Sequence, residues 1–193
     1  MRSILSLMAA PVTMALWSFV LPAAAQDRAK ACITALPKSW EGQAYAVDGN
    51  TLTGVGLKPV IRLWGIRAPR LRGADDVEMV PGMVTRAALE DLLAAGEHRV
   101  SCKVATWDDQ CRLVAQCTIS AEMPRGTPAA AHDIALRLLE DGFAYGFELG
   151  SGLSWDSEAS ARYAHIEAIA RQARKGLWTL WLGEAEQTTL PAK

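Results

Sequence analysis

The chain has 193 residues, half of them apolar and about a fifth charged, and its formal net charge is −1. This length supports one domain with a real core and is too short for two domains of ordinary size. A chain with so little net charge has no general attraction for nucleic acid, so any such binding would need a local basic patch.

Residues 1–25 have the pattern of a cleavable signal peptide. Arg2 supplies a positive charge, an apolar run follows it, and three alanines at 23–25 form a small-residue cleavage site. A retained membrane anchor is the alternative, although a proline and polar residues interrupt the apolar run. We therefore expect an exported protein, periplasmic or secreted, that has no membrane contact after cleavage. Loss of Arg2 would change the net charge from −1 to −2.

The four cysteines all follow the expected cleavage point. An even number of cysteines in an exported protein argues for two disulfides, for which three connectivities exist. A zinc site is the alternative, but the chain has no C-x-x-C pair and no histidine at ligand spacing. The cysteines are Cys32, Cys102, Cys111 and Cys117.

The first half of the mature chain predicts three short strands after an irregular lead-in at 26–41. The Asp48-Gly49 dipeptide is a strong turn signal, and β-branched and aromatic residues are concentrated on both sides of it. Residues 71–80 carry four charges and a glycine, which predicts a mobile loop. The expected strands are Gln43–Val47, Thr51–Val55 and Pro59–Ile66.

Pro81 begins a predicted helix that extends to about Ala95, and Gly96 provides its stop. Apolar residues recur along it at helical spacing, so one face should pack against the strands. The residues expected on that face are Val84, Ala88 and Leu92, with Leu89 and Leu93 beside them.

The segments 99–106 and 112–119 predict a β-hairpin. Cys102 and Cys117 lie almost equally far from its turn, so they should face each other across the two strands. A cross-strand pair whose Cβ atoms are about 5 Å apart can form a disulfide with modest adjustment. We therefore expect Cys102–Cys117, which leaves Cys32 to join the N-terminal segment to Cys111.

The remainder of the chain predicts two more helices with an extended aromatic segment, 143–149, between them. Asp133 is the expected cap of the first helix, and the second begins at Ser154 or Asp156. The residues expected on the buried face of the last helix are Tyr163, Ile166, Ile169 and Ala173.

Five short strands and three helices predict an α+β fold of the OB type, a partly closed five-stranded β-barrel with helices, over residues 42–180. A Pro/Gly linker is expected at 123–128, and residues 181–193 are expected to form a flexible tail.

Several stretches of this chain resemble the staphylococcal-nuclease-like, or thermonuclease, family. V-D-G-N-T-L and V-I-R-L-W-G-I-R-A-P-R are similar to the family's D-G-D-T and R-L-x-G-I-D-A-P-E. W-D-D-Q-C-R-L-V-A is similar to its D-x-Y-G-R-x-x-A turn. Two later matches are L-L-E-D-G-F-A-Y and A-x-Y-x-x-x-E-A-x-A-R-x-x-x-x-G-L-W. They run in order from about Gly42 to Trp178, which is nearly the whole mature chain.

The resemblance supports the OB-fold barrel and implies Ca²⁺-dependent cleavage of phosphodiesters. In such enzymes, two aspartates hold the metal and the glutamate after the proline handles water, while two arginines clamp the phosphate as catalytic residues. In this chain the arginines correspond to Arg62 and Arg112, the three carboxylates correspond to Asn50, Arg67 and Arg70, and the small residue between the last two is Ala68.

These differences reverse the charge at the corresponding positions. Three carboxylates and two arginines carry −1 before metal binding, whereas one asparagine and four arginines carry +4. Two unit charges about 4 Å apart interact by roughly 4 kcal/mol at an effective dielectric constant of about 20, so a divalent cation would be repelled. We therefore expect no metal and no cofactor, and a protein that binds phosphate groups, nucleic acid or another anionic partner without cutting it. The expected anion-binding residues are Arg62, Arg67, Arg70, Arg72 and Arg112.

Three other interpretations stay open. The arginines would merely pair with acidic residues at 75–78 or with Asp108 if the enzyme had lost its function without gaining another. An active nuclease would hold Ca²⁺ with Asn50 and the same loop carboxylates. A structural or partner-docking envelope protein would use its tail or the segment 143–149. The oligomeric state and the identity of any protein partner are open as well.

Overall fold

The computed structural model describes residues 32, 35–58, 60–120, 131–147 and 155–182, and the following account is confined to them. The predicted leader, half of the lead-in, the linker at 123–128 and all but the first two residues of the tail lie outside the described residues.

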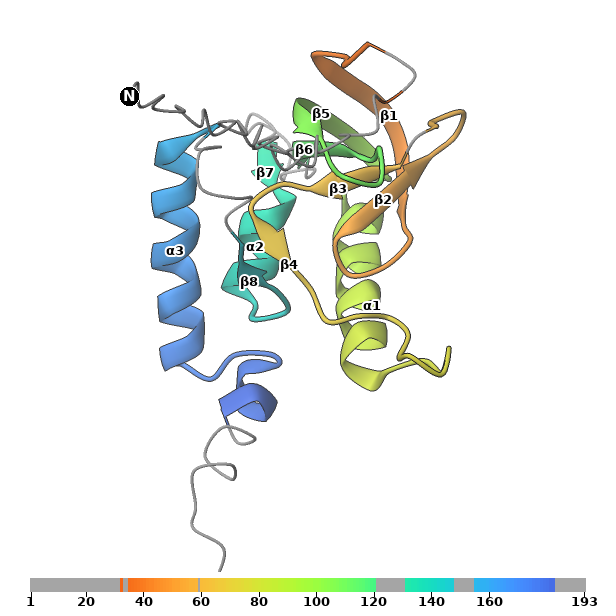
Figure 1. The fold of residues 1–193 in the computed structure, drawn as a ribbon. Coiled ribbons are helices and arrows are strands. Elements are labelled where there is room, and N and C mark those ends of the chain that lie inside the picture. The colour runs from red at the N-terminus through yellow and green to blue at the C-terminus, as the bar shows by residue number, and fades with distance from the viewer. Residues whose placement is uncertain (1–31, 33–34, 59, 121–130, 148–154, 183–193) are drawn as a thin grey trace, which may run out of the picture.

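A closed β-barrel of five strands forms the centre of the molecule (Figure 1). Its strands follow the order β3-β2-β1-β5-β6, and a parallel pairing of β3 with β6 closes the ring. A further strand, β7, pairs with the outer edge of β6. The α+β fold with an OB-type barrel, predicted from the strand and helix pattern, is therefore confirmed. The strands are β1 (Ser39–Ala46), β2 (Thr51–Gly54), β3 (Ile61–Leu63), β5 (Arg99–Trp107), β6 (Leu113–Ser120) and β7 (Ala131–Asp133).

Two strand predictions were wrong. β1 begins at Ser39, inside the expected irregular lead-in, because its first residues pair with β5, with Trp40 opposite Cys102. The expected strand Pro59–Ile66 is interrupted at Gly65, whose φ of +75° turns the chain out of the barrel. The residues after the turn form β4 (Ile66–Arg67), which pairs with β8 (Tyr145–Gly146) in a separate small sheet.

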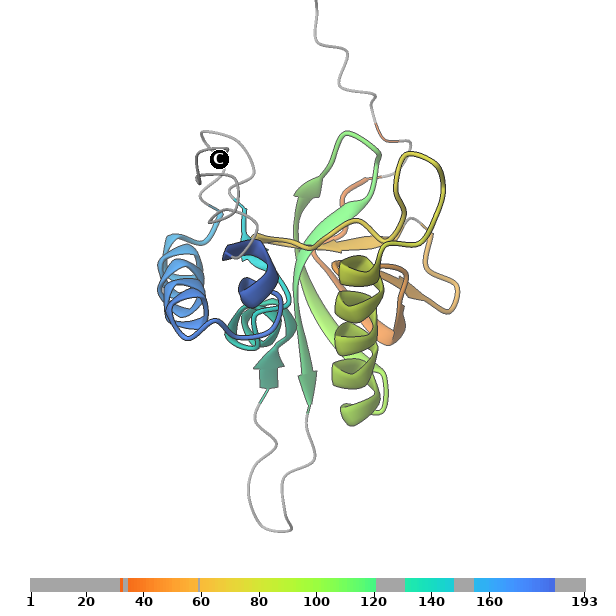
Figure 2. The ribbon, with the colours of Figure 1, turned by 90° about the horizontal axis from the view of Figure 1, so that it is seen from below.

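The helices α1, α2 and α3 flank the barrel, and a short helical segment at 178–182 follows α3. Figure 2 shows α1 (Val80–Ala95) on one side of β5 and β6, with α2 (Ile134–Glu140) and α3 (Ser157–Gln172) on the other. Asp133 and Asp156 cap α2 and α3, each by accepting a hydrogen bond from a backbone N–H in the first turn. No helix within the described ranges is long and apolar enough to cross a membrane.

The buried faces of α1 and α3 are rotated from those expected. α1 buries Leu89 and Leu93, whereas Val84 is 39% exposed. α3 buries Tyr163 as expected, but Ile169 is 46% exposed. Both helices carry apolar residues on more than one face, so the spacing alone did not select the side that packs. The small residues at their contacts, Gly82 in α1 and Ala159 and Ala170 in α3, allow close approach to the neighbouring elements.

The two expected disulfides are both present. Cys102 and Cys117 are direct partners in the β5–β6 register, with Cα atoms 4.1 Å apart. Cys32 is bonded to Cys111 across a sequence separation of 79, with Cα atoms 5.5 Å apart. The first bridge lies within the hairpin, and the second holds the N-terminal segment against the β5–β6 turn.

A hydrogen-bonded cluster joins α3 to the sheet. The Tyr163 hydroxyl donates to Asp133 Oδ2 at 2.5 Å, and Gln116 Nε2 donates to the same oxygen at 2.8 Å. The other Asp133 oxygen accepts the cap hydrogen bond from the N–H of Leu136. Tyr163 is only 2% exposed, and burial together with the charge of Asp133 raises its pKa. The neutral hydroxyl is therefore the form that the fold requires.

We expect Tyr163→Phe to lower the free energy of unfolding by about 1–2 kcal/mol at pH 8, because Asp133 loses a hydrogen-bond donor. The pKa of Tyr163 is raised in the folded state. The contribution of its hydroxyl is therefore complete below the unfolded-state pKa of about 10 and decreases above it. Urea denaturation from pH 8 to 11 should show the difference between wild type and variant shrinking. A constant difference would contradict this account.

Candidate functional site

Closure of the barrel brings two distant arginines together. Arg62 lies in β3, which runs parallel to β6 with Arg62 opposite Val114. The N–H of Leu113, at the start of β6, donates to the carbonyl of Val60 at 3.0 Å. Arg112 directly precedes β6, so this pairing places it beside the residues that lead into β3. The site therefore depends on a contact between segments about fifty residues apart in sequence.

The Asp108 carboxylate lies between these two arginines. Its Oδ2 is 2.6 Å from Arg112 Nε and 4.0 Å from Arg62 Nη1. Its Oδ1 accepts hydrogen bonds from the backbone N–H groups of Gln110 and Arg112, each at 2.9 Å. The side chain is only 5% exposed. One carboxylate thus closes the turn and orients both guanidinium groups.

The turn that carries Arg112 is also held by a disulfide, at the adjacent residue Cys111. Cys111 has a φ of +56°, a backbone conformation that non-glycine residues rarely adopt. Its bond to Cys32 joins this turn to the N-terminal segment. This bond restrains the turn next to Arg112.

Arg67 lies over the same aromatic ring, that of Phe147, as Arg62. Its guanidinium carbon lies 3.5 Å from the centre of the Phe147 ring, and that of Arg62 lies 5.7 Å from the same centre. The ring is positioned by the backbone, because the N–H of Phe147 donates to Gly65 at 2.9 Å. The sequence predicts that Phe147 lies in an extended aromatic segment, and it gives no sign that the ring contacts the arginines. Only the β4–β8 pairing, which local sequence does not reveal, brings it to Arg67.

The electrostatics of the cluster favour an incoming anion. The guanidinium groups of Arg62, Arg67 and Arg112 and the carboxylates of Asp108 and Asp109 together carry a local charge of +1. Burial lowers the pKa of Arg62, and Arg112 lowers it further; Asp108 acts in the opposite direction, and Arg67 adds to the lowering. Arg62 nevertheless stays charged at neutral pH, because an arginine titrates far above it. A bound anion would relieve the repulsion among these groups.

Of the other two arginines expected in the cluster, Arg72 is paired with acidic residues of its own loop. Arg72 is in the loop before α1, where its guanidinium group lies 3.5 Å from Asp76 and 3.4 Å from Glu78. It also donates to the Asp76 carbonyl at 3.0 Å. Asp76 and Glu78 therefore pair with Arg72, which is the kind of contact that the open alternative of arginines paired with acidic residues at 75–78 describes. Arg70 is exposed, and its carbonyl lies against Gly82 of α1.

Asn50 stands at the position of the family's first metal aspartate, and it makes hydrogen bonds within the protein. Asn50 donates its side-chain amide to the Ile66 carbonyl at 3.4 Å, and its N–H bonds to Asp48 Oδ1 at 2.9 Å. Ala68 packs against the neighbouring turn, so closely that any side chain at Gly49 would overlap with it.

Calcium takes six to eight oxygen ligands, most often from several carboxylates. In the described part of the chain, no three histidine, cysteine or acidic side chains gather in a way that would hold a metal ion. At the positions of the two metal aspartates stand an amide, Asn50, and a cation, Arg67. The residues present therefore do not fit this ion.

Comparison with known proteins gives one match. The model of a family described as "Staphylococcal nuclease homologue" matches residues 60–180, which is more than half of the chain. The matched range contains β3, β6 and the turn between β5 and β6, and hence Arg62, Asp108 and Arg112. None of the curated proteins compared with this chain matches it.

We expect Asp108→Asn to lower the free energy of unfolding by about 2 kcal/mol. The substitution leaves the turn's acceptor in place but removes the charge that pairs with Arg112 and Arg62, and a hydrogen bond between charged groups contributes about 1.5–3 kcal/mol. The exposed neighbour Asp109 provides the control, and Asp109→Asn should change the value by less than about 0.5 kcal/mol. Equal effects of the two variants in urea denaturation would contradict the role assigned to Asp108.

Proposed function

Because this chain belongs to the staphylococcal nuclease homologue family, we propose that it binds phosphate groups through Arg62, Arg67 and Arg112 and does not cleave them. The observation that carries this proposal is the position of Arg62, which lies beside Arg112 at the Asp108 carboxylate and beside Arg67 at the Phe147 ring. The cluster has more positive than negative charge in a protein whose net charge is −1.

Phosphate is the ligand that suits this arrangement best. Guanidinium groups present planar pairs of N–H donors that match the spacing of phosphate oxygens, and the charge on both partners strengthens the hydrogen bonds. Arg62 and Arg112 are held in place by Asp108, and Arg67 by the Phe147 ring, so little side-chain entropy is lost when the anion binds. The partial burial of Arg62 and Arg112 limits screening of their charge by salt, compared with fully exposed arginines.

The absence of cleavage follows from the residues that stand at the family's carboxylate positions. Hydrolysis of a phosphodiester in this family's manner needs carboxylates that hold a metal and a further one that handles water. Asn50, Arg67 and Arg70 stand at those positions. The Asn50 amide is engaged with the Ile66 carbonyl, and a guanidinium group at position 67 repels a divalent cation. In the loop after Arg70, Asp76 and Glu78 are paired with Arg72, and Asp75 accepts a hydrogen bond from the N–H of Val77.

The two disulfides support a role outside the cytoplasm. Disulfides persist in oxidising compartments and are rare where glutathione and thioredoxin keep thiols reduced. All four cysteines are paired, Cys32 with Cys111 and Cys102 with Cys117. We accordingly propose that this protein is exported and meets its phosphate-bearing ligand there.

Calorimetric titration with inorganic pyrophosphate tests binding. We expect binding that weakens as salt rises, and a loss of tenfold or more in Arg67→Ala and in Arg112→Ala, because each removes a charged hydrogen-bond donor. Arg72→Ala is the matched control, since its side chain is paired within the exposed loop. Absence of binding, or equal losses in all three variants, would contradict the proposed site.

Cleavage is tested separately by incubating plasmid DNA and RNA with the purified protein and Ca²⁺, Mg²⁺ or Mn²⁺. We expect both substrates to stay intact. Cleavage that a chelator abolishes and that Arg112→Ala removes would show an active nuclease, and would overturn the non-cleaving part of the proposal.

A further inference from the structure

The helix α1 has two apolar faces, and the fold covers only one of them. Leu89 and Leu93 are directed at the barrel core and are fully buried. On the opposite side of the helix, Val80 is 68% exposed and Val84 is 39% exposed. Val80, Val84 and Ala88 follow each other at intervals of four residues, so they lie on one face. A continuous apolar stripe of this kind, unlike single exposed residues, is typical of a surface that binds a partner.

The exposed stripe forms one wall of a groove between α1 and α2. Val84, Ala88 and Leu92 line the groove from α1. Leu138 and Phe143 line it from α2 and from the turn that follows α2. The volume of the groove is about 480 Å³. A groove between two helices with apolar walls accepts the side chains of a third helix.

Hydrogen bonds hold the two walls of this groove together. The hydroxyl of Thr85, a buried residue of α1, lies 3.1 Å from the carbonyl oxygen of Phe143. The N–H of Phe143 donates to the carbonyl of Leu138 at 2.9 Å. The turn before Phe143 contains Gly142, whose φ is +75° and whose α-carbon has no room for a side chain beside the Lys175 backbone. The groove is therefore formed before a partner arrives, which lowers the entropic cost of binding.

Acidic side chains border the apolar walls. Asp91 of α1 and Asp141 at the end of α2 both line the groove. Asp91 is exposed, and among the residues that the structure describes none forms an ion pair with it. Arg137 lies 3.6 Å from Asp141 and 2.6 Å from Glu140, so one cation is shared by two carboxylates. Three carboxylates and one guanidinium group leave a charge of −2 on this border.

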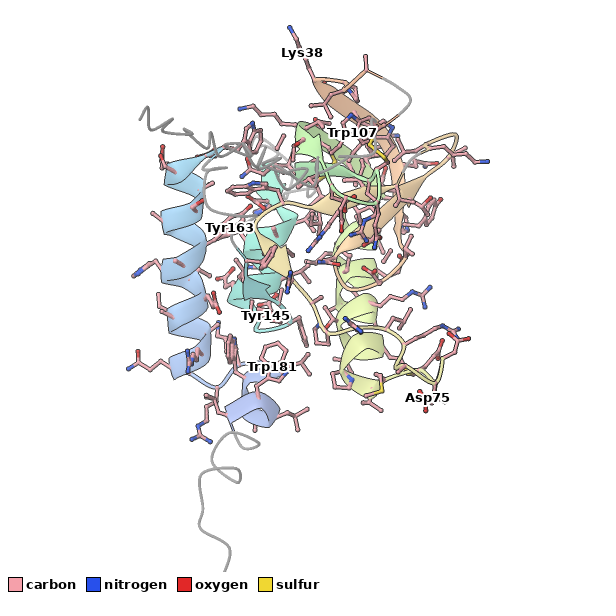
Figure 3. All side chains as sticks on the ribbon, in the orientation of Figure 1. Lys38, Asp75, Trp107, Tyr145, Tyr163 and Trp181 are labelled. Atoms are coloured by element: carbon pink, nitrogen blue, oxygen red, sulfur yellow. A yellow bond between two sulfur atoms is a disulfide. The ribbon has the colours of Figure 1, made fainter. Side chains whose placement is uncertain are left out.

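The loop that leads into α1 is acidic as well. Figure 3 shows Asp75 in this loop at the lower end of α1, next to the beginning of the exposed stripe. Residues 71–79 contain three carboxylates and one arginine, Arg72, a net charge of −2. The arginine of α1, Arg86, donates to the Ala46 carbonyl in β1 at 3.3 Å, so it is directed at the barrel and not at the groove. A partner with basic residues beside apolar ones therefore matches this surface in charge.

We propose that the groove between α1 and α2 binds an amphipathic helix of another protein. The apolar side chains of that helix fill the groove, and its lysines or arginines lie beside Asp91 and Asp141. The stripe from Val80 to Leu92 is about 18 Å long, which corresponds to roughly three helical turns of a partner with apolar residues at positions i, i+3, i+4 and i+7.

The negative border also selects against two other occupants. A second copy of this chain that used the same face would bring like charges together, and a membrane with anionic lipids would be repelled. None of the groove residues belongs to the arginine cluster at Asp108, so this docking site does not depend on the proposed phosphate binding.

Two synthetic peptides test the groove by fluorescence anisotropy with the disulfide-bonded protein. Both have fourteen residues with leucines at the spacing given above, and all other positions are lysine in one peptide and glutamate in the other. We expect the lysine peptide to bind at least tenfold more tightly than the glutamate peptide at physiological salt. Equal affinities, or preference for the glutamate peptide, would overturn the proposal.

Charge reversal locates the binding. Asp91→Lys should weaken binding of the lysine peptide about tenfold and strengthen binding of the glutamate peptide, because a repulsive contact replaces an attractive one. Glu158→Lys is the matched control, since it changes the net charge of the protein equally at an exposed position of α3. Equal effects of the two substitutions would show attraction to the whole protein and would contradict the groove.

Removal of apolar contacts provides an independent test. The double variant Val80→Ser/Val84→Ser should weaken binding of the lysine peptide at least fivefold. Ile169→Ser is the control, because Ile169 is 46% exposed on α3, outside the groove. Thermal unfolding checks that each variant is folded, and unchanged binding by the folded double variant would contradict the proposal.

Sedimentation velocity distinguishes the occupants. We expect the wild-type protein to show no self-association through this face. A dimer that the double variant Val80→Ser/Val84→Ser abolishes would show that a second copy fills the groove, and would overturn the assignment to a basic helix.

Discussion

The parallel pairing of β3 with β6 is the contact on which the rest of this structure depends. It closes the five-stranded barrel and buries Ile61 and Val114 completely. It also brings Arg62 to Arg112 across a long stretch of sequence. Parallel neighbours cannot be joined by a tight turn, so the helix α1 and the strand β5 must lie between them along the chain. The fold and the arginine cluster therefore form together or not at all.

Within that frame, Asp108 sets the electrostatic character of the site. Four isolated arginines would repel one another and spread into solvent. The buried carboxylate instead fixes two of them, and the Phe147 ring fixes a third, Arg67. The residual positive charge is smaller than residue counting suggests, but it is held in one place and partly withdrawn from solvent. A concentrated charge of this kind recognises phosphate better than a larger diffuse one does.

Much of the candidate site was accessible from sequence, and the exceptions have a common cause. Positions 62 and 112 were predicted together, and the structure places both beside Asp108. Arg72 was expected to join them, but its nearer partners in the loop, Asp76 and Glu78, hold it. The contribution of Phe147 was missed because it arises from a two-residue strand, β8, that pairs with β4 far away in sequence. Periodicity carries no signal for so short a strand.

The sequence by itself determined the barrel and its three helices, the pairing of Cys102 with Cys117, and the cap at Asp133, because these follow from local spacing and turn chemistry. It also determined that arginines stand where carboxylates would be needed to hold a metal. Only the tertiary structure decided which arginines meet, which face of α1 is buried, and that the Phe147 ring lies against Arg67. Those outcomes depend on contacts between distant segments, in which burial and charge pairing outweigh any local preference.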